Sequence, residues 1–493
     1  MSVVSELRAM SRIRPLQLGA LTALLVGVGA NAFRLKYCVL DLDIWWHLKV
    51  GDWIVQHLAV PRNGILSRTA ANRPWVAYSW GYEVLLSRAY AWFGLMGVGV
   101  FGTLLTIGVA YSIYWMARRI SGKFWISCLL AVVTSSAFLF DLMPRPVFLS
   151  IVLFTVVLTM ILEAQRREQL QTLYWLPLII LCWANLHIQF IYGLFLVGLL
   201  LGVTLTQQVA ARMGVKVEFL APSCLPAGRV GMIFAACVVA SWMGPYSYHL
   251  YEVIANYSRA KVAYSAIMEL QPLSFRVFSN FAELFLAAAA FYAVGSRKKT
   301  DLFKLALLVI GSVVAFRTLR DAWFLCIPAA ACLADIVVEK ADGEAAETPF
   351  ALLGVFAASC LLLLLLAHET EFTPRDLDRA ITGNFPVKAA NFLRRNPQPG
   401  PLYNTFDWGG FLMWYMPQYP VSIDGRNDLY GDEFDATYFR TQGGDLSYKT
   451  DLTLGESRVI LLRKTDGLVY SLGLDPNFRK IYEDELAAVF VRQ

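Results

Sequence analysis

A succession of apolar runs, each close to the length that crosses a bilayer, constrains this chain more than any other feature. The runs lie near residues 16–33, 94–117, 124–141, 146–163, 172–186, 188–206, 229–244, 280–295, 302–317, 321–338 and 349–367. The hydrocarbon core offers no partner for backbone polar groups, so segments that cross it form helices of about 20 residues. The sequence therefore predicts a mainly α, polytopic helical bundle with about eleven spans.

The composition agrees with a chain whose main solvent is lipid. The chain is 57% hydrophobic and 16% charged. Its net charge is +6, but Lys and Arg are scattered between the apolar runs, so we expect no nucleic-acid partner. The chain has no phosphate-binding G-x-x-x-x-G-K-[ST] loop, no H-E-x-x-H pair and no G-x-S-x-G elbow. Nucleotide-driven transport and metalloprotease action therefore have no support.

The basic residues of the short loops predict the orientation of the bundle, because such residues tend to stay on the cytoplasmic side. Counting from a cytoplasmic N-terminus, the loops predicted to be inside carry Arg118, Arg119 and Lys123, then Arg166 and Arg167, then Arg212, Lys216 and Arg229, then Arg297, Lys298 and Lys299. The last inside loop, around Lys340, is rich in acids and gives no signal. We expect a multi-pass protein of the inner (plasma) membrane with its C-terminus on the periplasmic, extracytoplasmic side.

Two domains are expected. Residues 1–367 would form the transmembrane domain, whose first outer loop, 34–93, contains helices lying in the membrane interface. Residues 368–493 change to a mixed polar composition with Gly and Pro turns. Their closing stretch predicts a strand at 458–463, a short helix near 467–473 and two further strands, and therefore a small extracytoplasmic α/β domain.

The first outer loop opens with DLDIWWHLKVGDWI, whose apolar residues recur at helical spacing. Asp41 and Asp43 precede this helix, where carboxylates can cap free backbone N–H groups. The alternative is functional, because two acids at membrane depth can act as a general base or bind a cation. His47, one helical turn beyond Asp43, and Glu83 are candidates for the same cavity, although each can instead be a structural or solvated side chain.

Three arginines in short outer loops are candidates for binding an anion. Arg145 lies between two prolines in DLMPRP, which restricts its backbone and favours a fixed guanidinium suited to phosphate. Arg317 and Arg320 lie in FRTLRDAWF at the membrane surface. The alternatives are interfacial snorkelling for Arg145 and a local ion pair with Asp321 for Arg320.

Further polar residues lie in the other outer segments. Asn185 and His187 occur in WANLHIQF, between two spans with almost no loop, where they either line the cavity or bond one helix to another. His249 begins a Tyr-rich segment and is a further candidate for the cavity. Nearly all polar residues that are costly at membrane depth therefore fall on the outer side.

These residues resemble the integral membrane glycosyltransferases of the GT-C superfamily, in a bacterial branch that uses polyprenyl-phosphate sugars. The resemblance rests on the first outer loop, on MPRP and WANLH, and on YNTFDWGGFLMWYMPQYPVSIDGRNDLYG in the C-terminal segment. It implies that a sugar moves from a polyprenyl-phosphate-linked donor to a glycan, lipid or protein acceptor on the extracytoplasmic face. Asp43, with Asp41 as the alternate, would be the base of an inverting transfer, and Arg145 and Arg320 would hold the lipid phosphate.

The resemblance leaves two points open. A divalent metal can be ligated by Asp41 and Asp43, but no other ligand is evident. In the C-terminal segment, Trp408, Asp424 and Arg426 are candidates for binding a saccharide or protein acceptor, although DGR at 424–426 is also typical of a simple turn. The competing functions are a transporter or flippase of lipid-linked or small polar solutes, and a non-catalytic protein of envelope polysaccharide assembly.

Overall fold

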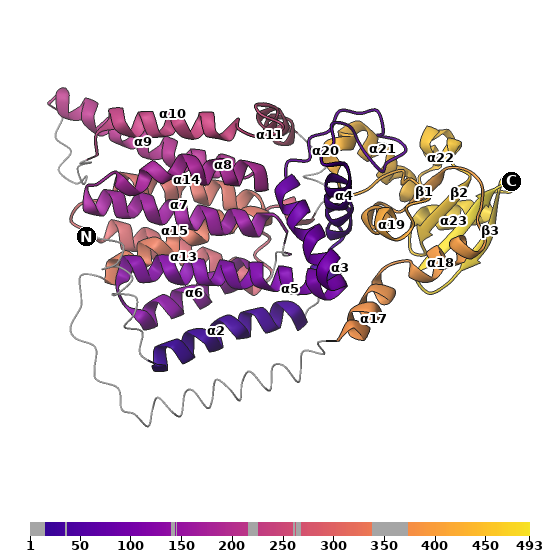
Figure 1. Ribbon diagram of the computed structural model, residues 1–493, viewed down its shortest axis with the longest axis horizontal. Coiled ribbons are helices and arrows are strands. Elements are labelled where there is room, and N and C mark those ends of the chain that lie inside the picture. The colour runs from indigo at the N-terminus through magenta and orange to yellow at the C-terminus, as the bar shows by residue number, and fades with distance from the viewer. Residues whose placement is uncertain are drawn as a thin grey trace.

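The computed structural model describes residues 15–34, 37–139, 143, 145–214, 225–259, 262, 268–337 and 373–493. A helical bundle occupies one end of the molecule and a small sheet with its own helices occupies the other (Figure 1). The outer segments lie between them. The mainly α fold with a small C-terminal sheet confirms the predicted fold class.

Every predicted span between 16 and 338 coincides with a helix, whereas the predicted span 349–367 lies outside the described residues. Among the described residues, five helices are long and apolar enough to cross a membrane: α2, α5, α7, α9 and α13. The number of spans therefore stays a prediction. The helices of the bundle are α2 (Pro15–Arg34), α5 (Trp80–Ser121), α6 (Phe124–Phe138), α7 (Val147–Arg167), α8 (Leu176–Leu186), α9 (Phe190–Arg212), α10 (Ala227–Ser241), α13 (Phe278–Gly295), α14 (Leu302–Arg317) and α15 (Trp323–Ile336).

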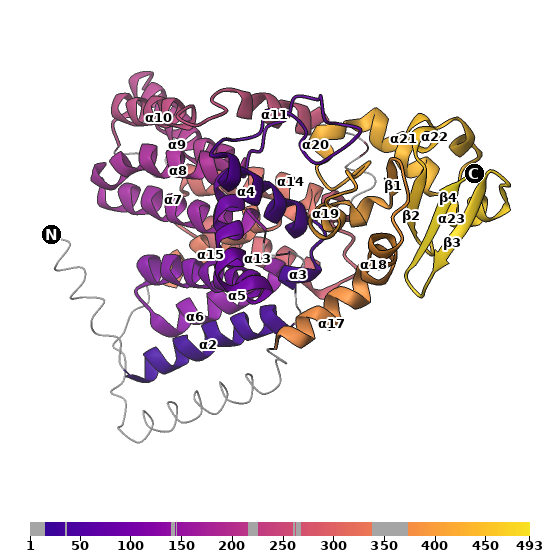
Figure 2. The same cartoon turned by 45° about the vertical axis from the view of Figure 1, so that its right-hand side comes forward.

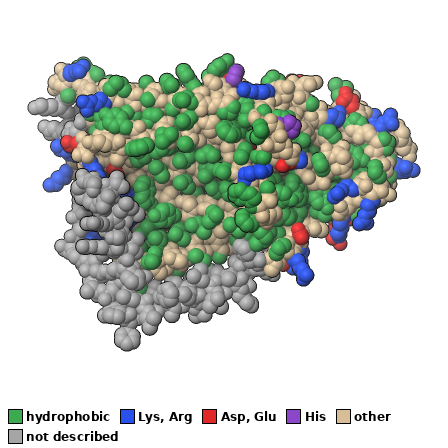
Figure 3. Space-filling view, viewed as in Figure 1, with side chains coloured by type: hydrophobic (Ala, Val, Ile, Leu, Met, Phe, Trp, Pro, Cys, Tyr) green, Lys and Arg blue, Asp and Glu red, His purple; other side chains and the backbone are tan. Residues whose placement is uncertain are grey.

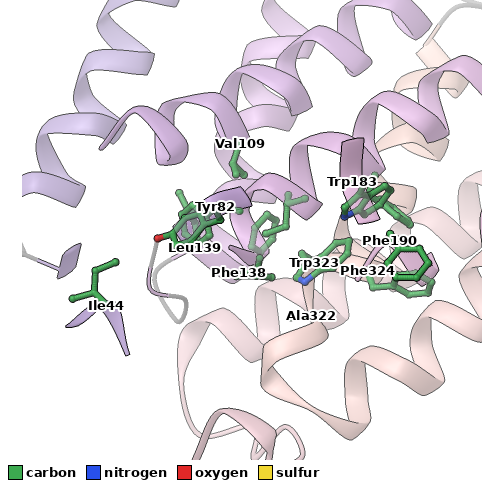
Figure 4. Packing of buried hydrophobic residues seen from close by; sticks show 14 of the residues in the cluster. Ile44, Tyr82, Val109, Phe138, Leu139, Trp183, Phe190, Ala322, Trp323 and Phe324 are labelled. Atoms are coloured by element: carbon green, nitrogen blue, oxygen red, sulfur yellow. The ribbon is translucent and has the colours of Figure 1, made fainter. Parts of the chain in front are cut away.

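The surface of the bundle separates apolar from charged side chains. A broad hydrophobic surface covers the bundle on the face shown, and charged side chains gather mostly toward the two ends (Figure 3). Inside, aromatic side chains from different helices pack together, and Phe154 lies 5.2 Å from the rings of both Trp323 and Phe324. Figure 4 shows part of this core, including Trp183 and Phe190.

Helix α5 is interrupted at Gly94, where the backbone has φ 58° and ψ −147°. A positive φ is easily adopted only by glycine, so the chain can change direction there. Residues 80–93 belong to the outer loop, and the apolar part of the helix follows. The break falls where the sequence predicts the span to begin.

The first outer loop contains α3 (Tyr37–Leu40) and α4 (Ile44–His57), and α11 (His249–Arg259) lies in a later outer segment. The predicted helix after Asp43 is thus confirmed. Helix α4 crosses α5 closely at Gly51, where a Cβ atom would stand 1.9 Å from the backbone oxygen of Glu83. This contact brings the start of α4 against the end of the bundle.

The C-terminal segment contains a four-stranded sheet in the order β1-β2-β4-β3. The strands are β1 (Leu402–Asn404), β2 (Val459–Arg463), β3 (Phe478–Glu483) and β4 (Ala487–Arg492), with β1 parallel to β2 and the other pairs antiparallel. The predicted strands and the helix α23 (Gly467–Leu474) are confirmed; β1 was not predicted. Its other helices are α17 (Pro374–Asn384), α18 (Val387–Arg395), α19 (Gly409–Tyr415), α20 (Asn427–Tyr430), α21 (Asp432–Gln442) and α22 (Leu452–Glu456).

The C-terminal segment packs directly on the first outer loop. Helix α19 lies against α4, and a Cβ atom at Gly410 would stand 2.8 Å from the oxygen of Leu42. The loop after α4 pairs with the same segment, because Arg68 N–H donates to the oxygen of Val421 at 2.8 Å. Figure 2 shows α4, α19 and α20 between the bundle and the sheet. The two predicted domains therefore share an interface at the start of α4.

Candidate functional site

Asp41 and Arg145, which are 104 positions apart, form a forked ion pair. The Nε and Nη2 atoms of Arg145 donate to the two carboxylate oxygens of Asp41, each at 2.7 Å. Asp41 is 2% exposed. Two parallel charge-assisted bonds fix both side chains, so the loop between α6 and α7 is joined to the start of α4.

Asp43 lies on the other side of the same guanidinium and remains partly open. Its Oδ2 atom is 3.1 Å from Nη1 of Arg145, and its side chain is 23% exposed. Trp46 Nε1 donates to Asp43 Oδ1 at 3.1 Å. Glu269, from the segment before α13, also reaches Nη1 of Arg145 at 3.1 Å. One guanidinium therefore contacts three carboxylates: Asp41 is buried and bonded to it through both oxygens, whereas Asp43 and Glu269 keep 23% and 29% of their side chains exposed.

The side chain of Asp43 does not cap α4. Although Asp43 is the residue that precedes the helix, it bonds none of the described backbone N–H groups of the first turn. Asp41 instead accepts from the backbone N–H of Asp43 at 2.9 Å. Capping therefore does not account for the two acids, and the functional interpretation stays a prediction.

The environment of Asp43 favours a proton-accepting role near neutral pH. Burial raises the pKa of Asp43 to about 6, against the opposing effect of the Arg145 charge. A general base works best when its pKa lies near the working pH. At neutral pH the carboxylate is mostly ionised yet still basic enough to accept a proton.

His47 and Glu83 form a buried pair behind Asp43. His47 Nδ1 lies 3.2 Å from Glu83 Oε1, with side chains 5% and 1% exposed. The His47 ring stacks on Trp46 at 3.6 Å, and Trp46 bonds Asp43. Burial lowers the pKa of His47 well below its usual value, and the charge of Arg145 adds to this effect. A neutral imidazole therefore supports the tryptophan that orients Asp43.

Arg320 lies near the same groups from a different part of the chain. It belongs to the short turn between α14 and α15, and its charge lowers the pKa of both His47 and Tyr257. Tyr257 is also influenced by Asp43, and its hydroxyl lies 3.3 Å from that of Tyr78. No hydrogen bond or close ion pair involves the Arg320 side chain within the described part of the chain.

The predicted Arg320–Asp321 pair is not formed as a close contact, because Asp321 accepts from Thr318 Oγ1 at 2.9 Å and Gln189 Nε2 at 3.3 Å. Arg317 is exposed at the end of α14. Arg320 therefore remains a candidate phosphate-binding residue, and Arg317 does not.

The other three residues predicted to line the cavity, Asn185, His187 and His249, lie in three different environments. Asn185 bonds helices, accepting from Trp80 Nε1 at 3.1 Å and donating to the oxygen of Met243 at 3.3 Å. His187 is 2% exposed and pairs with Ser150 at 2.8 Å, beside the Tyr78 ring. His249 lies on the outer side at the start of α11, 2.8 Å from Glu252.

The three predicted acceptor-binding residues of the C-terminal segment are buried. Trp408, Asp424 and Arg426 are 1%, 0% and 1% exposed. Arg426 Nε and Nη2 donate to the two oxygens of Asp424, each at 2.8 Å, and Nη2 also reaches the oxygen of Ile65 at 2.9 Å. Buried side chains such as these are not available to an acceptor. Arg426 and Asp424 instead hold the DGR turn against the first outer loop.

Breaking that buried pair is expected to destabilise the interface. In Arg426→Met the Asp424 carboxylate stays buried without its cation, which typically costs about 3–5 kcal/mol. We expect a lower thermal midpoint in detergent for this variant, whereas Arg440→Met, at an exposed position of α21, leaves the midpoint unchanged. Equal midpoints for the two variants would show that the pair does not stabilise the interface.

Gly425, the middle residue of the same turn, touches the candidate base. A Cβ atom at Gly425 would stand 2.0 Å from Asp43 Oδ1 and 3.3 Å from Trp46 Nε1. The C-terminal segment therefore forms a wall of the site. Neither this contact nor the places of Glu269 and Tyr257 at the site were predicted. For Gly425 the signal was the glycine of DGR, which is equally typical of a turn.

The residues present do not fit a divalent cation between Asp41 and Asp43. The Arg145 guanidinium occupies the position between the carboxylates and bonds both oxygens of Asp41. Within the described ranges, no group of three or more His, Cys, Asp or Glu is arranged to hold a metal ion. No step below passes through a metal.

The chain's sequence matches no family model and no curated protein. Solved structures do match its fold. The archaeal oligosaccharyltransferase AglB from Archaeoglobus fulgidus, in complex with an inhibitory peptide and a dolichol-phosphate, aligns with a TM-score of 0.52 and 11% identity, over 89% of this chain and 69% of AglB. Its apo form aligns with a TM-score of 0.53 and 10% identity over the same shares.

ArnT from Cupriavidus metallidurans bound to undecaprenyl phosphate aligns with a TM-score of 0.45 and 15% identity, over 95% of this chain and 97% of ArnT. At 10–11% identity, the AglB alignments show that this chain shares the fold of that oligosaccharyltransferase.

Proposed function

We infer that this chain is a membrane glycosyltransferase that moves a sugar from a polyprenyl-phosphate-linked donor to an acceptor hydroxyl, with Asp43 as the base. The observation that supports this most directly is a partly exposed carboxylate, with its pKa raised to about 6, beside a fixed guanidinium. Asp43 lies 3.1 Å from Arg145 and keeps 23% of its side chain exposed. Asp41 is bonded on both oxygens and is only the alternate base.

The proposed transfer is a single displacement. The acceptor oxygen attacks the anomeric carbon while its proton passes to a carboxylate oxygen of Asp43. The bond between the anomeric carbon and the phosphate oxygen breaks, and its electron pair leaves with the polyprenyl phosphate. Fixed positive charges stabilise the negative charge that develops on this leaving group. Attack from the face opposite the phosphate inverts the anomeric configuration.

Arg320 is the stronger candidate for direct phosphate contact. Its guanidinium makes no hydrogen bond or close ion pair among the described residues, so its N–H groups can bond a phosphate without losing a protein partner. Arg145 uses three nitrogen atoms on Asp41, Asp43 and Glu269. We assign Arg145 mainly to holding the acids, with its remaining N–H facing the phosphate.

The fold and the position of the site support a lipid-linked donor. AglB, which shares the fold, has been solved with a dolichol-phosphate and an inhibitory peptide. Helix α4, which begins directly after Asp43, lies between the bundle and the C-terminal sheet (Figure 1). A polyprenyl tail can stay in the apolar region while its phosphate reaches the start of α4. We place the site on the extracytoplasmic side of the inner membrane, with the N-terminus cytoplasmic.

The proposal is tested with the full chain in lipid nanodiscs. Polyprenyl-phosphate-linked hexose, pentose and amino-sugar donors are added separately with a membrane extract from cells that lack the protein. We expect mass spectrometry to detect free polyprenyl phosphate together with an extract component that is heavier by one sugar. Passage of intact donor across the bilayer without a covalent product would contradict the proposal and favour the transporter.

The pKa of Asp43 predicts the acid limb of the pH profile. A base must be unprotonated, and the protonated fraction of Asp43 grows as the pH falls through about 6. We expect kcat/KM to fall about tenfold per pH unit below this value and to level off above it. Because neighbouring acids are coupled to Asp43, the midpoint is an apparent one. A flat profile through pH 6 would remove Asp43 as the base.

A further inference from the structure

Two adjoining cavities lie between α11 and the start of α20 and α21, outside the site described above. Their volumes are about 240 and 360 Å³, within or near the range of small-molecule sites. Because Asn256 and Asp428 line both, the two cavities adjoin, and we refer to them together as the α11 groove.

The α11 groove contains a buried carboxyl that lacks a partner. Asp435 lines the smaller cavity and is 2% exposed. Within the described part of the chain its side chain has no hydrogen bond, and its Oδ1 atom is fully buried. Buried polar groups in proteins nearly always have a partner. A ligand in the cavity that donates a hydrogen bond would reach this carboxyl at Oδ2, since Oδ1 has no accessible surface.

The other polar groups of the α11 groove are mostly hydrogen-bond acceptors. Asp432 lines the smaller cavity with Asp435, and Glu252 lines the larger one, while Asp428 accepts from Trp75 Nε1 at 3.1 Å. Only two arginines, Arg62 and Arg259, line the groove. The lining is therefore net acidic, which disfavours phosphate, sulfate and carboxylate ligands.

Tyr257 connects the α11 groove to the proposed base. It lines the smaller cavity, and its hydroxyl lies 3.3 Å from that of Tyr78. Burial raises the pKa of Tyr257, and the charges of Asp428 and Asp43 raise it further. Tyr257 is therefore close enough to both the groove and the proposed base to be affected by each.

We propose that the α11 groove binds an uncharged, hydroxyl-rich glycan as the acceptor of the transfer. This inference rests on the proposed glycosyl transfer and names the substrate class of its second partner. Sugar hydroxyls donate to the carboxyl of Asp435 and to its acidic neighbours, and the amide of Asn256 both donates and accepts. One hydroxyl of the same glycan passes Tyr257 to reach Asp43.

Glycan binding is measured with the full chain in nanodiscs on an array that carries neutral, amino-sugar, sulfated, phosphorylated and uronic-acid glycans. We expect a subset of the uncharged glycans to bind. Asn256→Ala, at an exposed position, and Asp435→Asn each weaken this binding about tenfold, the effect of about one lost hydrogen bond. Glu433→Gln, on the exposed side of the same α21 turn, leaves binding unchanged.

Three outcomes would overturn the proposal: no uncharged glycan bound, preference for anionic glycans, or binding that both variants leave unchanged. Asp43→Asn separates this proposal from the proposed function. If Asp43→Asn binds glycan normally and the native chain consumes no donor, the glycan site stands and the transferase proposal fails. If donor is consumed but no uncharged glycan binds, the transferase stands and the α11 groove is not its acceptor site.

Discussion

Replacing Asp43 with asparagine is expected to lower the rate of sugar transfer about 100-fold to 10,000-fold, the range that a general base typically contributes. The amide keeps the shape of the side chain and can still accept from Trp46 Nε1, but it cannot take the proton of the acceptor. The protein should therefore fold and bind a polyprenyl-phosphate donor. Single-turnover rates with a polyprenyl-phosphate sugar separate the loss of chemistry from any change in binding.

The matched control for this variant lies on the same helix. Asp52→Asn removes the same charge from α4, but Asp52 pairs with Lys49 and is 35% exposed. Its transfer rate should stay within about twofold of the native rate, since exposed ion pairs contribute little. Transfer by Asp43→Asn at the rate of Asp52→Asn would mean that Asp43 is not the base.

Gly425→Ala should lower transfer about 100-fold, although Gly425 lies in the C-terminal segment and carries no chemical group. Its Cβ atom would stand 2.0 Å from Asp43 Oδ1, so the carboxylate or the turn must move. A shift of about 1 Å in a catalytic group can cost about 100-fold in rate. Transfer rates and thermal midpoints of the purified variant measure the two possible consequences separately.

Gly473→Ala is the matched control, because no atom lies within 4 Å of the Cβ atom it would add. We expect native transfer from this variant. A midpoint near the native value together with slow transfer is the expected pattern for Gly425→Ala. Native rates from both variants would show that the C-terminal segment does not shape the site.

The sequence predicted the bundle and the helix after Asp43 because both depend on local patterns. An apolar run near 20 residues long has one stable solution in lipid, and Trp46, Val50 and Ile54 mark one face of α4. It also predicted that Asp43 and Arg145 share a pocket. Their common position on the outer side was sufficient for this, even though 102 positions separate them.

The division of roles within that pocket was not predictable. Asp41 and Asp43 are two positions apart and chemically identical, and only the tertiary structure locks Asp41 on Arg145 while leaving Asp43 partly open. Glu269 reaches the same guanidinium from the segment before α13. No periodicity in the sequence links that segment to the first outer loop.

The C-terminal segment was predicted in part. The runs RVILLR, FRKIYED and AAVFVRQ predicted β2, β3 and β4, whereas β1 has only three residues and little pattern. Arg426 was predicted either to bind an acceptor or to belong to a simple turn, whereas the structure buries it in a pair with Asp424. Its partner Asp424 is two residues away, but the Ile65 oxygen that completes the pairing belongs to the first outer loop.

The anomeric configuration of the product tests the central claim most directly. Purified protein is given a polyprenyl-phosphate sugar of known configuration, and the new glycosidic bond is assigned by NMR before any further processing. A single displacement assisted by Asp43 and stabilised by Arg320 and Arg145 predicts inversion. Retention would mean either two successive displacements or attack from the face of the departing phosphate, and either would contradict the account.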